Sequence, residues 1–185
     1  EGVLNNYIAA RGIERTITQI IFPFLEKVGI LWMTNHINPG QEHLISSIIR
    51  QKLIVGIDNA YSTIRINKTV LLFLPDGEYH ELGLLFVYYL LKSRGVEVIY
   101  LGSSIPLDDL EYVAKVRKPD YLYTHLTAPG SRFNMEKFMT GVQKKFSDTP
   151  VIISGSLIQG AGKKAGHPVI FKKSYQEVME FVTSL

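Results

Sequence analysis

The stretch VLLFLPDGEYHELG, residues 70–83, decides how the rest of the chain is interpreted. Its first five residues form a short apolar run, as expected of a strand that is buried on both faces. The run ends at Pro75-Asp76-Gly77, which is a turn signal, and residues 80–94 then follow a helical pattern that stops at Gly95. The stretch therefore predicts a strand, a turn and a helix, as in the first half of a βαβ unit.

The alternation of strand and helix continues to the end of the chain. Further strands are predicted at residues 96–101, 121–126, 151–153 and 169–171, and further helices at 103–116, 132–146 and 175–182. Five strands alternating with helices predict a parallel sheet with helices on both faces. We therefore expect a flavodoxin-like or Rossmann-like α/β domain over residues 68–185, with ligands bound at the carboxyl ends of its strands.

Residues 1–67 contain no convincing strand and predict a helical bundle instead. Apolar residues recur at three- and four-residue steps between positions 13 and 28, and Pro23 inside that pattern predicts a kink or a division of the helix. Residues 38–41, Asn-Pro-Gly-Gln, begin another helix with Asn as N-cap and Gln three residues later. The apolar residues that we expect this helix to turn inward are Leu44, Ile45, Ile48, Ile49, Leu53 and Ile54.

The composition excludes several classes of function. The 185 residues include no cysteine, which excludes disulfides, thiolate catalysis and Cys-ligated metal sites. A net charge of +3 is too small to argue for nucleic-acid binding by this chain. No apolar stretch is long enough for a membrane span, and no signal peptide is recognisable, so we expect a cytoplasmic location. Since the chain begins at Glu1 without a Met, we expect a longer protein.

Small and polar residues follow three of the predicted strands. Glu78, His80 and Gly83 follow the first strand, Thr124 lies near the end of the third, and Ser154-Gly155 follows the fourth. The carboxyl ends of parallel strands share one edge of a sheet, so these residues should meet there. A carboxylate two residues before a histidine can hold one ring nitrogen and leave the other for a metal ion. The glycines and hydroxylic residues would leave a slot between strands and helix.

These signals also have plainer structural explanations. His80 can be a locally hydrogen-bonded residue at a helix start, Gly83 a packing glycine, and Ser154-Gly155 a turn. No P-loop, no Rossmann glycine motif after the first strand and no Gly-x-Ser-x-Gly elbow is present, which disfavours nucleotide binding in those modes and a serine hydrolase. His36, His43 and His80 match no metalloprotease spacing.

Three short motifs, in order, resemble the cobalamin-binding signature Asp-x-His-x-x-Gly, Ser-x-Leu and Gly-Gly. Residues 78–83 are similar to the first motif, with Glu in place of Asp. After a gap of 40 residues, Thr124-His125-Leu126 resembles the second motif, and after a further 27 residues Ser154-Gly155 stands where the third is expected. Upstream, Trp32 is followed after nine residues by Glu42-His43, a spacing typical of light-sensing, MerR-type transcription regulators that use adenosylcobalamin.

This resemblance covers nearly the whole chain and implies its architecture and cofactor site. It implies a four-helix bundle and a Rossmann-like cobalamin domain, preceded by a winged helix-turn-helix that binds DNA and is absent from this chain. It implies that His80 is the lower axial ligand of cobalt, in place of the cofactor's dimethylbenzimidazole, and that Glu78 orients it. The residues implied to give room to the displaced nucleotide tail are Gly83, Thr124, Leu126, Ser154 and Gly155.

The bundle would supply the lid of this site. In the family that the chain resembles, Trp32, Glu42 and His43 would cover the upper, adenosyl-bearing face of the corrin ring. The resemblance implies a sensor without enzymatic turnover, in which adenosylcobalamin assembles a DNA-binding tetramer and light dissociates it. Methylcobalamin remains a second candidate cofactor.

Besides Glu78, three departures from the family pattern matter. Met33 stands directly after Trp32, where the best-studied members have a His that binds cobalt after photolysis, and a thioether is a poorer ligand for oxidised cobalt. Ser154 replaces a Gly, and Thr124 replaces a Ser. His125 alternates with Thr124, so we expect it to face away from the slot.

Two alternatives remain open at this point. The chain can be a corrinoid protein of a methyltransferase system, which would share the helical cap and the histidine motif. It can also be an interaction module that keeps the fold and has lost cobalamin.

Overall fold

The computed structural model describes residues 2–33, 38–131, 133–160 and 166–185. Their contacts divide the chain into two compact units, Glu1–Ala60 and Tyr61–Leu185, and each unit is described separately. The domain boundary expected from the sequence, between residues 67 and 68, falls inside strand β1 (Ile66–Pro75).

The C-terminal unit is built on a five-stranded parallel sheet, which confirms the predicted fold class. The strands in the described part of the chain are β1, β2 (Val96–Ile105), β3 (Tyr121–His125), β4 (Val151–Ser154) and β5 (Val169–Lys172). They lie in the order β2-β1-β3-β4-β5, the flavodoxin-like order, in which the direction of winding reverses between β1 and β3. At the carboxyl edge, His125 of β3 pairs with Ser154 of β4.

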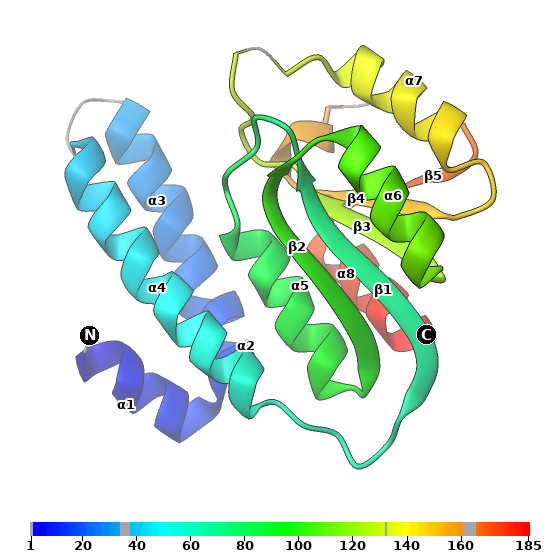
Figure 1. The fold of residues 1–185 in the computed structure, drawn as a ribbon. Helices are drawn as coiled ribbons and strands as arrows, with labels where there is room; N and C mark the ends of the chain where they lie inside the picture. The colour runs from blue at the N-terminus through cyan, green and yellow to red at the C-terminus, as the bar shows by residue number, and fades with distance from the viewer. Residues whose placement is uncertain (1, 34–37, 132, 161–165) are drawn as a thin grey trace. The chain divides into compact units, whose positions relative to one another are not determined.

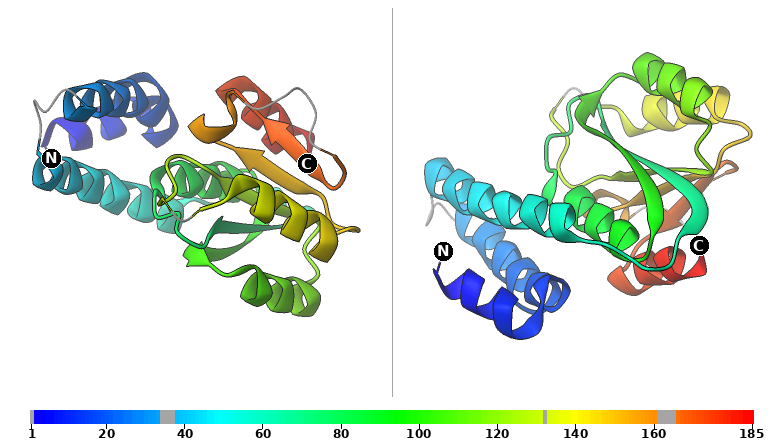
Figure 2. Two further views of the ribbon diagram at one scale, coloured as in Figure 1. Left: turned by 90° about the horizontal axis from the view of Figure 1, so that it is seen from above. Right: turned by 60° about the horizontal axis from the view of Figure 1, so that its bottom comes forward.

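Helices cover both faces of this sheet, as the sequence predicts. Helices α6 (Leu107–Arg117) and α7 (Met135–Lys145) lie on one face, and α5 (Leu82–Ser93) and α8 (Tyr175–Ser184) lie on the other (Figure 1). The right-hand view of Figure 2 shows the sheet between these two pairs. The crossover from β1 to β2 through α5 runs toward one edge of the sheet, and those through α6 and α7 run toward the other. Right-handed crossovers in opposite directions place their helices on opposite faces.

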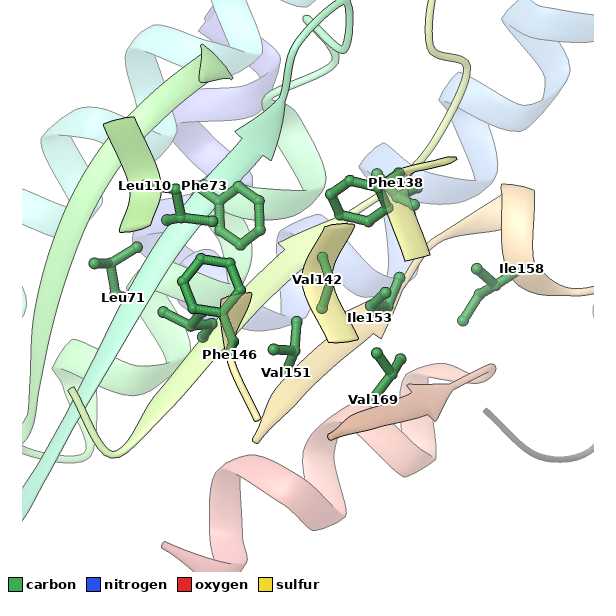
Figure 3. Close-up of a cluster of buried hydrophobic side chains, with 12 residues drawn as sticks. Leu71, Phe73, Leu110, Phe138, Val142, Phe146, Val151, Ile153, Ile158 and Val169 are labelled. Atoms are coloured by element: carbon green, nitrogen blue, oxygen red, sulfur yellow. The ribbon is translucent and has the colours of Figure 1, made fainter. Parts of the chain in front are cut away.

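The core between the sheet and the α6–α7 pair is a cluster of buried apolar side chains (Figure 3). Leu71 and Phe73 of β1 meet Leu122 of β3 there, and α7 adds Phe138 and Val142. Each fully buried side chain of this size contributes about 1.5–3 kcal/mol to folding. The alternating residues of the same strands face α5 and α8, where the Tyr123 ring stacks on Phe181 at 6.0 Å between ring centroids.

Two helix starts differ from the sequence-based expectation. Helix α5 begins at Leu82, two residues after the expected start, so His80 lies in the loop that precedes it. Strand β2 continues to Ile105, so Ser103 and Ser104 belong to a strand and the expected helix begins only at Leu107, after Pro106. Pairing with β1 as far as Pro75 opposite Ile105 extends this strand.

The N-terminal unit is helical. Helices α2 (Ile13–Thr16), η1 (Ile17–Ile21) and α3 (Phe22–Met33) follow one another without a break. Together with α1 (Gly2–Arg11) and α4 (Pro39–Asn59), these segments form three helical rods in the described part of the unit. The segment η1 is a π-helix placed just before Pro23, and such a widened turn accommodates a proline that cannot donate a backbone hydrogen bond. The helix therefore continues through Pro23.

Helix α4 begins where the sequence predicts. The Asn38 side chain accepts a hydrogen bond from the Gln41 N–H at 3.0 Å, and the Gln41 side chain accepts one from the Asn38 N–H at 3.2 Å. Its buried residues are Ile49, Leu53 and Ile57, spaced by four. The expectation that Leu44 and Ile54 face inward is wrong, because they are 64% and 40% exposed. Of the helices in the described residues, none has the length and apolarity that a membrane crossing requires.

Candidate functional site

A buried carboxylate organises the edge of the sheet at the end of β1. Glu78 is fully buried, and its Oε1 accepts hydrogen bonds from the backbone N–H groups of Tyr79 and His80, both at 2.9 Å. Its Oε2 accepts from the N–H groups of Thr127 and Ala128 at 2.9 and 3.0 Å. Thr127 and Ala128 belong to the loop after β3, so one side chain joins the loops that follow two neighbouring strands.

The same carboxylate holds the His80 ring. Glu78 Oε1 lies 2.6 Å from His80 Nδ1, and because a carboxylate only accepts, Nδ1 carries the donated proton. In a neutral imidazole the lone pair is then on Nε2. The His80 side chain is 50% exposed, while Glu78 is buried beneath it. This is the arrangement in which a second-layer carboxylate orients a metal-ligating imidazole.

The charge of Glu78 follows from its hydrogen bonds. Burial by itself raises the pKa of Glu78, but hydrogen bonds from the His80 ring and from the His80 and Thr127 N–H groups outweigh it. The pKa of Glu78 therefore falls to about 2. The carboxylate is ionised at neutral pH, and it keeps the His80 ring in one orientation.

A second group of side chains fills the space between Gly83 and the ends of β3 and β4. A methyl group added at Gly83 would lie 2.3 Å from His125 Cδ2, so the His125 ring packs directly on the first turn of α5. His125 Nδ1 lies 2.8 Å from Ser154 Oγ, and the buried Tyr123 hydroxyl lies 2.6 Å from the same oxygen. The expectation that His125 faces away from this slot is wrong: its ring occupies the space beside Gly83.

Thr124 and Leu126 lie on the other side of the strand. Leu126 belongs to the apolar cluster under α6 and α7, and Thr124, which alternates with Tyr123 and His125, is fully buried on that same face. Thr124 Oγ1 has no hydrogen-bond partner among the described residues. The structure thus places Gly83 and Ser154 on one face of the sheet, and Thr124 and the Leu126 side chain on the other, where the sequence predicted one common slot. Gly155 packs against the Leu126 backbone.

The His125 ring should make the stability of the protein depend on pH. Burial lowers the pKa of His125 to about 4, although the nearby Glu78 charge opposes that shift. Because this pKa lies below the ordinary value of 6.5, the unfolded chain binds more protons, and stability present above pH 6.5 is lost as pH falls through 4. We expect the wild-type protein to lose about 2 kcal/mol more than a His125→Gln variant between pH 7.5 and pH 5.

Denaturant unfolding of both proteins at the two pH values measures this difference. Equal losses in the wild-type protein and in the variant would contradict a partly buried, neutral His125 ring.

Sequence reasoning did not identify the contacts that hold the loop of Glu78 in place. Ser104, at a φ of +55°, donates from its hydroxyl to Asp76 Oδ1 at 3.0 Å, and its N–H donates to the Glu78 carbonyl at 3.1 Å. Gly77 N–H donates to the Ser104 hydroxyl at 3.2 Å. Ser104 lies 26 residues from Glu78 along the chain and carries no motif, so only the pairing of β1 with β2 reveals this role.

The residues expected to form the lid belong to the N-terminal unit. Trp32 lies on helix α3, but its side chain is outside the described residues, as is that of Met33. Glu42, half-buried, and His43, exposed, lie in the first turns of α4. Within this unit, α4 and the preceding rods line an apolar recess of about 280 Å³ that is open to solvent. Its lining residues are Leu4, Ile20, Ile21, Phe24, Ile45, Ile48 and Ile49.

A metal ion bound by His80 would need most of its other ligands from a cofactor. The described residues contain no group of three or more His, Cys, Asp or Glu side chains that could hold a metal ion. A single oriented imidazole suits a metal that is already held by a macrocycle and lacks only an axial ligand. The donor set therefore fits a metal–macrocycle cofactor better than a free metal ion.

Comparisons with known proteins point to the same class of cofactor. Residues 1–55 match the family model described as a B12 binding domain. The chain is 30% identical over 155 residues to the HTH-type transcriptional repressor CarH of Myxococcus xanthus, and 26% identical over 153 residues to the repressor CarA of the same organism. Each match covers 83% of this chain and 51% of the relative, so the chain spans about half the length of these proteins.

Solved structures share the fold. The monomethylamine corrinoid protein of Methanosarcina barkeri has a TM-score of 0.68 and 13% identity, over 100% of this chain and 90% of that protein. The methanol:cobalamin methyltransferase complex MtaBC of the same organism has a TM-score of 0.52 and 16% identity, over 98% of this chain and 70% of that chain. At these identities, the likeness is one of fold alone.

Proposed function

We infer that this chain, a homologue of the HTH-type transcriptional repressors CarH and CarA over 83% of its length, is the cobalamin-binding sensor region of a transcription regulator. The kinship inferred from the motifs between Trp32 and Gly155 is confirmed by these two relatives, and cobalamin binding is supported by the B12-binding match over residues 1–55. The observation that carries the proposal is the half-exposed His80 ring, held at Nδ1 by the buried Glu78 carboxylate.

His80 would hold the cofactor through Nε2, as the lower axial ligand of cobalt. Glu78 fixes the ring and keeps the proton on Nδ1, and the Thr127 and Ala128 N–H groups fix Glu78 in turn. When bound, adenosylcobalamin supplies a cobalt–carbon bond that light can break. We propose that Gly83, Ser154 and Gly155 lie beside the displaced nucleotide tail, and that Thr124 and Leu126 support this site from the opposite face of β3. The residues proposed to lie over the adenosyl face are Trp32, Glu42 and His43.

The proposed output is assembly and not turnover. Adenosylcobalamin would favour a DNA-binding oligomer, a tetramer in the simplest case, and loss of the adenosyl group would dissociate it. DNA contacts would come from a helix-turn-helix in the half of the relatives that this chain does not match. The alternative, a corrinoid protein of a methyltransferase system, is supported by the shared fold only, whereas the sequence relatives are repressors.

Absorption spectra with adenosylcobalamin in the dark test the proposed function. We expect the wild-type protein to shift the cofactor spectrum to the histidine-ligated form, and His80→Ala to abolish that shift and weaken binding at least tenfold. His167→Ala is the matched control, because His167 is exposed in the turn before β5. A wild-type spectrum equal to that of the free cofactor, or a shift that survives His80→Ala, would rule out the proposed ligation.

The switch is tested by size-exclusion chromatography before and after green light. We expect a larger species in the dark with adenosylcobalamin, and a smaller one after illumination. If the protein binds the cofactor but its size does not change with light, it is a sensor of cobalamin level and not of light. That result is expected if Met33 cannot replace the cobalt-binding histidine of the light-sensing members.

A further inference from the structure

The space beside Gly83 is filled by the protein's own side chain. A methyl group added at Gly83 would lie 2.3 and 2.4 Å from Cδ2 and Nε2 of His125, closer than real Cβ contacts allow. Glycine is therefore required at position 83 by the His125 ring itself, since Gly83 has no backbone conformation that demands glycine. In the structure, the His125 ring occupies the space that a flat ligand group would need between Gly83 and the ends of β3 and β4.

A hydrogen bond to Ser154 holds the His125 ring in this position. His125 Nδ1 is 2.8 Å from Ser154 Oγ, and Ser154, 1% exposed, is itself held by the buried Tyr123 hydroxyl at 2.6 Å. Behind this pair the Tyr123 ring stacks on Phe181 of α8. Moving the ring out breaks its hydrogen bond to Ser154 and leaves a gap beside Gly83.

We propose that His125 is a built-in occupant of this slot, so that a corrinoid with no lower nucleobase binds without moving it, whereas cobalamin must displace it. The inference rests on the proposed function, in which the displaced lower base lies beside Gly83. A dimethylbenzimidazole group is a flat two-ring base, larger than the imidazole that fills the slot. His125 is then a specificity-determining residue that selects among corrinoids by the size of their lower base.

The occupied slot can be tested without any corrinoid. We expect Gly83→Ala to lower the melting temperature of the wild-type protein, because the new methyl group collides with the ring. In a His125→Ala background the same Gly83→Ala change should not lower the melting temperature, since alanine is the better helix former. Additive effects of the two substitutions would mean that the ring does not fill the slot in solution.

Selectivity is measured by dark titration with adenosylcobalamin and with adenosylcobinamide, which lacks the lower nucleotide. Cobalamin must also detach its own base from cobalt, so the wild-type ratio of affinities alone does not decide the question. The decisive quantity is the change in that ratio. We expect His125→Ala to tighten adenosylcobalamin binding at least tenfold relative to adenosylcobinamide, and Ser154→Ala, which removes the anchor, to act in the same direction by about threefold.

The outcomes separate this inference from the proposed function. A ratio unchanged in both variants, with histidine ligation intact, would overturn the inference and leave the proposed function standing. Failure of both corrinoids to bind the wild-type protein and both variants would overturn the proposed function and the inference with it. His167→Ala controls for the loss of a histidine, and Ser154→Ala keeps the test decisive should His125→Ala fail to fold.

Discussion

Glu78→Ala is expected to destabilise the protein by about 3–5 kcal/mol and to weaken the histidine ligation of cobalamin by 10- to 100-fold. The carboxylate accepts four backbone hydrogen bonds, from Tyr79, His80, Thr127 and Ala128, and it is fully buried. Alanine leaves these donors without their acceptor and frees the loops after β1 and β3 from one another. The His80 ring loses its Nδ1 partner as well, so it is no longer held in one orientation.

Urea unfolding at pH 7 and dark titration with adenosylcobalamin measure the two effects. The matched control is Glu136→Ala, an exposed glutamate in the first turn of α7, for which we expect at most about 1 kcal/mol. Glu78→Asp keeps the charge and shortens the reach, so it should restore part of the His80 ligation. A Glu78→Ala protein as stable as the Glu136→Ala protein would show that the buried carboxylate does not join the two loops.

Most of the sheet could be predicted because its signals are local. An apolar run of five residues followed by Pro75-Asp76-Gly77 specifies where β1 ends, whatever lies elsewhere in the chain. The end of β2 could not be predicted in the same way. Ser103 and Ser104 have no preference for strand over helix start, and it is pairing with β1, distant in sequence, that extends the strand to Ile105.

In the functional site, too, the contacts local in sequence could be predicted and the contacts between distant segments could not. The contact between Glu78 and His80 joins residues two positions apart, so the sequence pattern predicts it. The Thr127 and Ala128 N–H groups, which donate to Glu78 Oε2, are backbone groups, and no sequence motif can reveal them. Nothing in the sequence distinguishes the two faces of β3, because Leu122 and Tyr123 are both fully buried. The alternation that separates His125 from Thr124 was predicted correctly, but the faces were assigned the wrong way round.

Gly155→Ala is expected to destabilise the protein by about 3 kcal/mol or more, up to loss of folding. Gly155 has φ +109° and ψ 171°, a backbone conformation that is essentially restricted to glycine. An added methyl group would lie 2.1 Å from the Leu126 carbonyl oxygen and 2.7 Å from the Leu126 carbonyl carbon and nitrogen. All three are backbone atoms, so no side-chain rotation can relieve the collision.

The close approach at Gly155 also holds the ends of β3 and β4 together. Leu126 N–H donates to the Ser154 carbonyl at 2.8 Å, and Leu157 N–H donates to the Leu126 carbonyl at 3.1 Å. A Gly155→Ala protein that still folds must separate these segments, which moves Ser154 away from His125, so we expect cobalamin affinity to change together with stability. The matched control is Gly160→Ala, where an added methyl group meets nothing within 4 Å. Thermal unfolding distinguishes the two variants, and equal melting temperatures would mean that Leu126 and Gly155 are farther apart than the structure places them.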